Sequence, residues 1–84
     1  MEFVWIKRSE RLPEHGQKIM SCGWTKGYHN GELIHSEVDE HPILDKYNGE
    51  FAGDNEMKQG EYKVITRVTH WAPIPALPDI SFED

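Results

Sequence analysis

The 84-residue sequence predicts a small, mainly β domain with a single antiparallel sheet of four to five short strands. Three observations lead to this prediction. No window of a dozen or more residues keeps the i, i+3, i+4, i+7 spacing of apolar residues that marks an amphipathic helix. Residues 61–71 form the longest β-prone run, with β-branched side chains at five of eleven positions. Two Asn-Gly pairs favour tight hairpin turns between strands.

The N-terminal quarter of the chain is expected to hold little regular structure before its first clear strand. Residues 9–12 allow at most a single helical turn, because a serine can cap it and Pro13 ends it. Residues 18–22 are apolar-rich and lie between Gly16 and Gly23, so we expect a short strand there.

Turn signals dominate the middle of the chain. Asn30-Gly31 and Asn48-Gly49 each suit a type I′ turn, in which two successive residues need a positive φ. Each pair is therefore expected to connect two strands of a hairpin. Residues 53–56 and 59–60 are rich in Gly, Asn and Asp and are predicted to be loops.

The long β-prone run at residues 61–71 has two faces, because successive side chains of a strand alternate. The face expected to point toward the core carries Tyr62, Val64, Thr66, Val68 and His70. Trp71 falls on the reverse face, so it needs cover of its own unless a bulge shifts the phase of the strand. We expect Trp71 and Trp5 to share one aromatic cluster that closes the domain.

The last part of the chain contains Pro73, Pro75 and Pro78, which remove backbone donors and exclude a central strand. We expect this segment to run extended along a sheet edge. The chain is too short to divide into two cores, so the prediction is a single domain at residues 1–78, with a frayed tail at residues 79–84.

Charge and composition narrow the classes of partner. Fifteen acidic residues stand against nine basic ones, and the segment from Glu32 to Glu61 is strongly acidic. Such a segment argues against direct binding of a nucleic-acid backbone and against a membrane surface, and it suits a basic partner protein. A single cysteine and an N-terminus without a secretory pattern predict a reducing cytoplasm.

The sequence carries no recognisable catalytic or metal-binding pattern. It contains no nucleophile elbow and no phosphate-binding glycine loop. His29, His35 and His41 are spaced by six residues, which matches none of the usual pairs of zinc ligands. We therefore predict that the protein is not an enzyme and has neither a metal site nor a cofactor.

Two motifs at the ends of the chain resemble a known family. Trp5-Ile6 is followed after four residues by Arg11-Leu12-Pro13-Glu14, and the closing motif is Val68-Thr69-His70-Trp71-Ala72-Pro73-Ile74-Pro75. Together they resemble the phage and prophage family known as domain of unknown function 551. Ala72 stands where that family usually has Met, and Leu77 interrupts its proline tail. The resemblance implies a bacterial host cytoplasm as the setting, and the family has no established activity.

Three functions remain as hypotheses. The first is a non-enzymatic phage accessory protein that binds and inhibits a basic host protein, as in counter-defence, through the acidic residues Glu37, Asp39, Glu40 and Asp45. The second is a homo-oligomer that sequesters a nucleotide-like signal in an aromatic pocket made from Trp24, Tyr28, Tyr47 or Trp71. The third is a structural or assembly accessory of a phage. His70 lies in the closing motif and is either a binding residue or a structural one whose ring packs beside Trp5 or Trp71.

Overall fold

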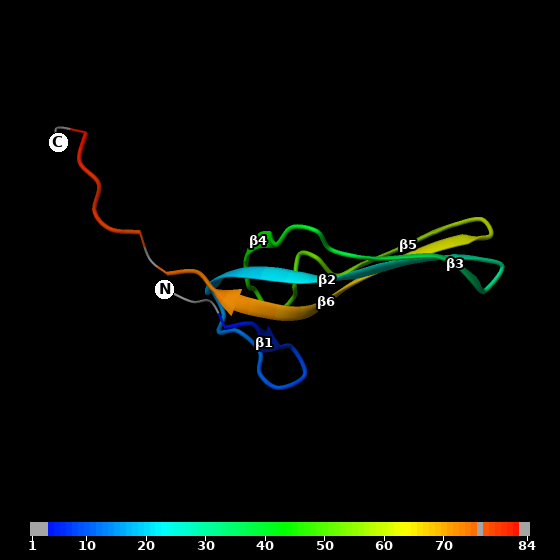
Figure 1. Cartoon of the computed structure of the whole chain (residues 1–84), viewed down its shortest axis with the longest axis horizontal. Helices are drawn as coiled ribbons and strands as arrows, with labels where there is room; N and C mark the ends of the chain where they lie inside the picture. Colours follow the sequence, from blue (N-terminus) through cyan, green and yellow to red (C-terminus); the bar gives the residue numbers. More distant parts are fainter. Residues whose placement is uncertain (1–3, 76, 83–84) are drawn as a thin grey trace.

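The computed structural model describes residues 4–75 and 77–82, which form one antiparallel sheet of six strands and no helix (Figure 1). The strands are β1 (Ile6–Lys7), β2 (Lys18–His29), β3 (Glu32–Val38), β4 (Ile43–Lys46), β5 (Asn55–Gln59) and β6 (Tyr62–Pro73). The mainly β prediction is confirmed, with six strands in place of four to five. The helical turn allowed near residues 9–12 is a single hydrogen-bonded turn, in which the Arg11 amide donates to the Lys7 carbonyl over 3.3 Å.

The two twelve-residue strands β2 and β6 pair along the middle of the sheet, and different strands flank them at each end (Figure 1). At one end β4 pairs with β2 and β1 pairs with β6. We call this four-stranded part the core half. At the other end β3 pairs with β2 and β5 pairs with β6. We call this part the hairpin half.

A β-bulge separates the two halves. Cys22 pairs with His70, but Gly23 pairs with Val68, so Thr69 is an extra residue on β6. Because of this extra residue, Val68 and Trp71 point to the same face, and both are buried. The alternative in which a bulge shifts the phase of the strand is therefore the one observed.

Tyr62, Val64, Thr66 and Val68 point to the core side of the sheet, as predicted, but only Val68 is buried, and the bulge turns His70 to the other face. Tyr62 remains 56% exposed and Val64 38% exposed, because they lie in the hairpin half, where no layer covers the sheet. The bulge places Trp71 on the core side instead.

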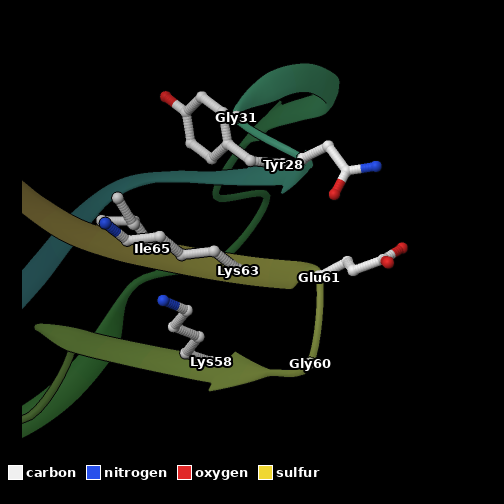
Figure 2. Close-up of a pocket in the computed structure, with 8 residues that line it drawn as sticks. Tyr28, Gly31, Lys58, Gly60, Glu61, Lys63 and Ile65 are labelled. Atoms are coloured by element: carbon white, nitrogen blue, oxygen red, sulfur yellow. The ribbon is translucent and has the colours of Figure 1, made fainter.

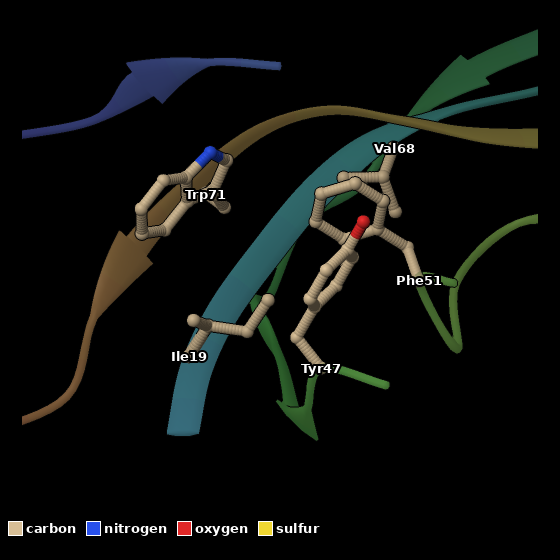
Figure 3. Packing of buried hydrophobic residues seen from close by; sticks show 5 residues of the cluster. All are labelled: Ile19, Tyr47, Phe51, Val68 and Trp71. Atoms are coloured by element: carbon tan, nitrogen blue, oxygen red, sulfur yellow. The ribbon is translucent and has the colours of Figure 1, made fainter. Parts of the chain in front are cut away.

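The core lies on one face of the core half. It consists of Ile19 from β2, Val68 and Trp71 from β6, and Tyr47 and Phe51 from the loop after β4 (Figure 3). Ile6 of β1 packs against this cluster opposite Trp71. Trp5 stays 41% exposed and is not part of the cluster, so the predicted sharing of one cluster by Trp5 and Trp71 is wrong. The side chain that closes the core from β1 is Ile6, because neighbouring residues of a strand point to opposite faces.

The turn predictions succeed at one Asn-Gly pair and fail at the other. Asn30 and Gly31 have φ angles of 49° and 81° and join β2 to β3, as a type I′ turn does. At the second pair only Gly49 has a positive φ, of 93°. There β4 pairs with β2 and β5 with β6, so the connection crosses the core face and does not form a hairpin.

The loops predicted at residues 53–56 and 59–60 are partly wrong. Residues 55–59 form β5, and Gly60, with a φ of 60°, lies with Glu61 in a two-residue turn between β5 and β6. The polar composition of β5 hides its strand character, since all five of its residues are exposed.

The end of the chain leaves the sheet. The Ile74 amide donates to the Lys18 carbonyl over 3.1 Å, and residues 77–82 then run away from the strands (Figure 1). Beyond Ile74 the predicted packing along a sheet edge is therefore wrong. Within the described residues there is no helix long and apolar enough to span a membrane.

Candidate functional site

The face of the sheet opposite the core is uncovered, and it carries all six lysines of the sequence. Because side chains alternate along each strand, the strand positions next to the core residues point to this open face. The pairing register places on it Lys7, Lys18, Lys26, Lys46, Lys58 and Lys63. We call this surface the lysine face.

Carboxylates of the strands are almost all on the other face. Glu32, Glu37 and Asp45 alternate with the lysine-face positions and point to the core side. Among strand residues only Glu56 shares the lysine face, and it forms ion pairs with Lys63 at 3.0 Å and Arg67 at 3.6 Å. A protein of net charge −6 thus presents one strongly cationic surface.

A cavity of about 650 Å³ lies on this face in the hairpin half, where β2, β6 and β5 run side by side (Figure 2). Its floor and walls come from Tyr28 of β2, Ile65 and Lys63 of β6, and Lys58 of β5. The two neighbouring turns form its rim at Asn30, Gly31, Gly60 and Glu61. Both turns that close the hairpins therefore border the cavity.

Two cationic side chains line this cavity side by side. Lys58 and Lys63 are direct partners across β5 and β6. Like charges at such positions destabilise a sheet. Glu56 compensates Lys63, and the hydrogen bond and charge of Lys63 lower the pKa of the Glu56 carboxyl. Within the described part of the chain Lys58 has no ion pair, so its charge is available to an anion.

A second aromatic group extends the site along β2. The Lys26 ammonium lies 4.4 Å from the centre of the Trp24 ring, in a cation–π contact. These two residues, with Ser36, Glu37 and Val38 of β3, line a shallow hollow of about 520 Å³. Trp24, Lys26 and Tyr28 occupy every second position of β2, so an aromatic ring, a positive charge and a second aromatic ring follow one another on the lysine face. Such an arrangement suits ligands that combine a planar ring with phosphate.

Of the four acidic residues predicted as a partner-binding surface, two have carboxylates that accept backbone hydrogen bonds. Asp39 accepts a hydrogen bond from the Gly23 amide at 2.8 Å, and its own amide donates to the Gly23 carbonyl. Asp45 accepts from the Ala52 amide at 2.9 Å and holds the loop over the core. Glu37 and Glu40 are exposed, with Glu37 3.4 Å from His35. Two of the four carboxylates therefore stabilise the fold.

The remaining predicted site residues divide between the core and the lysine face. Tyr47 and Trp71 are buried, and Tyr47 packs against Phe51 with ring centres 5.0 Å apart. Neither residue lines the cavity beside Tyr28, although an edge of Trp71 borders a separate hollow of about 330 Å³ next to Arg11. His70 is half-buried on the lysine face of the core half, and its Nδ1 lies 2.8 Å from the Thr69 hydroxyl. Of the aromatic residues predicted for a pocket, Tyr28 lines the cavity and Trp24 lines the neighbouring hollow.

The lysine face was not predicted from the sequence, because the strands that carry its lysines lie far apart in the chain. One local signal was present. If Gly60 and Glu61 are taken as a two-residue turn, Lys58 and Lys63 become cross-strand partners on one face. No group of three or more His, Cys, Asp or Glu side chains in residues 4–75 and 77–82 is arranged to hold a metal ion.

Comparison with known proteins gives a family but no function. No curated protein and no solved structure matches the chain. The model of one family, described as a protein of unknown function (DUF551), matches residues 4–79. This match covers both end motifs and every strand of the sheet. The chain therefore belongs to the DUF551 family.

Proposed function

We propose that the protein is a non-enzymatic binding protein that captures a small phosphorylated, nucleotide-like ligand in the cavity beside Tyr28. The observation that carries this proposal is the Lys58–Lys63 pair, which places two positive charges on adjacent strands next to an aromatic ring. A sheet that tolerates such a repulsive pair gains from a bound anion that lies between the two ammonium groups.

The cavity offers each part of such a ligand a suitable contact. The ring of Tyr28 and the side chain of Ile65 provide apolar surface for a base, and stacking on an aromatic side chain contributes about 1–3 kcal/mol per base. The ammonium groups of Lys58 and Lys63 suit phosphate oxygens as charge-assisted donors.

The setting implied by the family resemblance fits this role. A phage or prophage protein in the host cytoplasm that holds a nucleotide-like signal removes it from a defence pathway without chemistry. The alternative, inhibition of a basic host protein through an acidic surface, stays a prediction with less support, because Asp39 and Asp45 already bind backbone amides.

Titration of the protein with nucleotides tests the proposal. Mononucleotides, dinucleotides and inorganic pyrophosphate, each followed by calorimetry at low and moderate salt, separate base contacts from phosphate contacts. We expect at least tenfold weaker nucleotide binding for Tyr28→Ala and for Lys58→Glu. The matched control is Lys46→Glu, which reverses a charge on the same face in the core half.

The stability of the Lys58→Glu variant distinguishes a binding residue from a structural one. An opposite-charge pair across two strands contributes about 0.2–1 kcal/mol, so this variant should be as stable as the wild type or slightly more stable. Unchanged affinity of the variant for every nucleotide tested would refute the proposed site.

A further inference from the structure

We infer that residues 77–82 of one copy of the chain dock on the lysine face of the core half of a second copy, so that two copies exchange arms. This contact uses a part of the lysine face that the nucleotide cavity does not reach. The surface, the arm and the direction of the arm each support it.

The receiving surface is a row of apolar side chains that crosses the four strands, with Leu44 and Trp5 at its two edges, Met20 of β2 between them and lysines beside the row. Leu44 of β4 is 73% exposed, and Trp5, which precedes β1, is 41% exposed. Lys7, Lys18 and Lys46 surround them, and no strand residue of the core half places a carboxylate on this face. An apolar surface with a cationic rim fits a segment that is both apolar and acidic.

The arm has this composition. Leu77, Ile80 and Phe82 are 83%, 78% and 107% exposed, and three large apolar side chains within six residues are rarely left in water without a partner. Asp79 lies among them, and the sequence places two further acids at positions 83 and 84. The sequence has no Lys or Arg after Arg67. Arm and receiving surface are thus complementary in both polarity and charge.

The direction of the arm selects a second copy as its partner. The arm leaves the end of the sheet and points away from it (Figure 1). Pro73, Pro75 and Pro78 favour an extended chain, whereas a return to the same sheet requires a reversal of direction. An extended segment of six residues spans about 19 Å at ~3.1 Å per residue. Four strands about 4.8 Å apart are only about 15 Å across, so the arm is long enough to cross the neighbouring face.

Direct packing of two lysine faces on each other is disfavoured by their charge. Each face carries six lysines and one strand carboxylate, and like charges across an interface cost several kcal/mol. The acidic arm of the second copy avoids this repulsion.

The molar mass in solution, measured by light scattering after size exclusion, tests the inference. We expect a dimer for the wild type. An arm variant (Leu77→Ser, Ile80→Ser, Phe82→Ser) and a face variant (Leu44→Asp, Lys46→Glu) should each be monomeric. The control variant Leu33→Asp with Lys58→Glu makes the same chemical changes on the hairpin half and should remain a dimer. Circular dichroism establishes whether each variant is folded. If the double face variant is unfolded, the single substitution Lys46→Glu takes its place.

Mixing the variants separates arm exchange from other modes of association. A face variant retains an intact arm and an arm variant retains an intact face, so an equimolar mixture should form a mixed dimer with one arm contact. A wild type that is monomeric at every concentration would overturn the inference. So would an arm variant that remains dimeric, or a concentrated mixture that stays monomeric.

Discussion

Substitution of Gly23 by Ala should be among the most damaging small changes in this protein. A Cβ atom at this position would overlap the Arg67 carbonyl oxygen and lie 2.7 Å from the Arg67 carbonyl carbon and 2.9 Å from Val68 Cα. Ordinary contact begins at 3.4 Å, and the obstructing atoms are backbone, so β2 and β6 must separate at the bulge. The hydrogen bonds between Gly23 and Asp39 would be disturbed as well.

The magnitude follows from the contacts that are lost. Two or three backbone hydrogen bonds at about 1 kcal/mol each, with some loss of packing around the buried Val68, give a cost of roughly 3 kcal/mol. A domain of this size has a total stability of about 4–13 kcal/mol at ~0.05–0.15 kcal/mol per residue. Gly23→Ala should therefore remove a large fraction of the free energy of unfolding.

Urea denaturation followed by tryptophan fluorescence measures this loss. The matched control is Gly27→Ala on the same strand, where the nearest atom to a Cβ is His35 Cβ at an ordinary 3.6 Å. That change should be neutral or stabilising by up to about 1 kcal/mol, because alanine restricts the unfolded chain. Equal urea midpoints for Gly23→Ala and the wild type would show that the close approach at the bulge is not required.

Three further outcomes are expected. Trp71→Ala should cost about 3–5 kcal/mol in urea denaturation, because the indole is 1% exposed, whereas Trp24→Ala on the open face should cost much less. Burial, and secondarily the charge of Asp39, raise the pKa of the Cys22 thiol above 9.0. Since its folded pKa exceeds its unfolded one, the stability that the thiol contributes is present below the unfolded pKa and is lost as pH rises through the folded one. Urea midpoints above pH 9 should therefore fall more in the wild type than in Cys22→Ala. The melting temperature should be the same with a chelator and with added zinc.

The sequence predicted those features of the fold that depend on local chemistry. The type I′ turn at Asn30-Gly31 follows from the φ angles that these two residues tolerate. The strand predicted at residues 61–71 follows from the β propensity of its residues. The bulge was one of the two arrangements that the position of Trp71 allowed. Each of these can be judged from a few neighbouring residues.

Features that depend on the pairing of distant strands could not be predicted. Asn48-Gly49 has the same local signal as Asn30-Gly31, but the strands around it pair with β2 and β6 and not with each other. The lysine face depends on the register of five strands, so a chain with an acidic middle folds to present a cationic surface. Asp39 and Asp45 illustrate the same point, since only the fold shows that their carboxylates accept backbone hydrogen bonds.

The uneven cover of the sheet has a consequence for local opening. Every residue of β3 and β5 is exposed, while the buried cluster lies entirely in the core half and its loop. Backbone amides of the hairpin half should therefore exchange with solvent through partial openings that leave the core intact. A ligand that binds only the closed hairpins raises the free energy of opening by mass action, by about 2.7 kcal/mol at a concentration one hundred times its Kd. The amides then exchange more slowly. Amide exchange in β3 and β5 can then report occupancy of the cavity by a ligand whose identity is unknown.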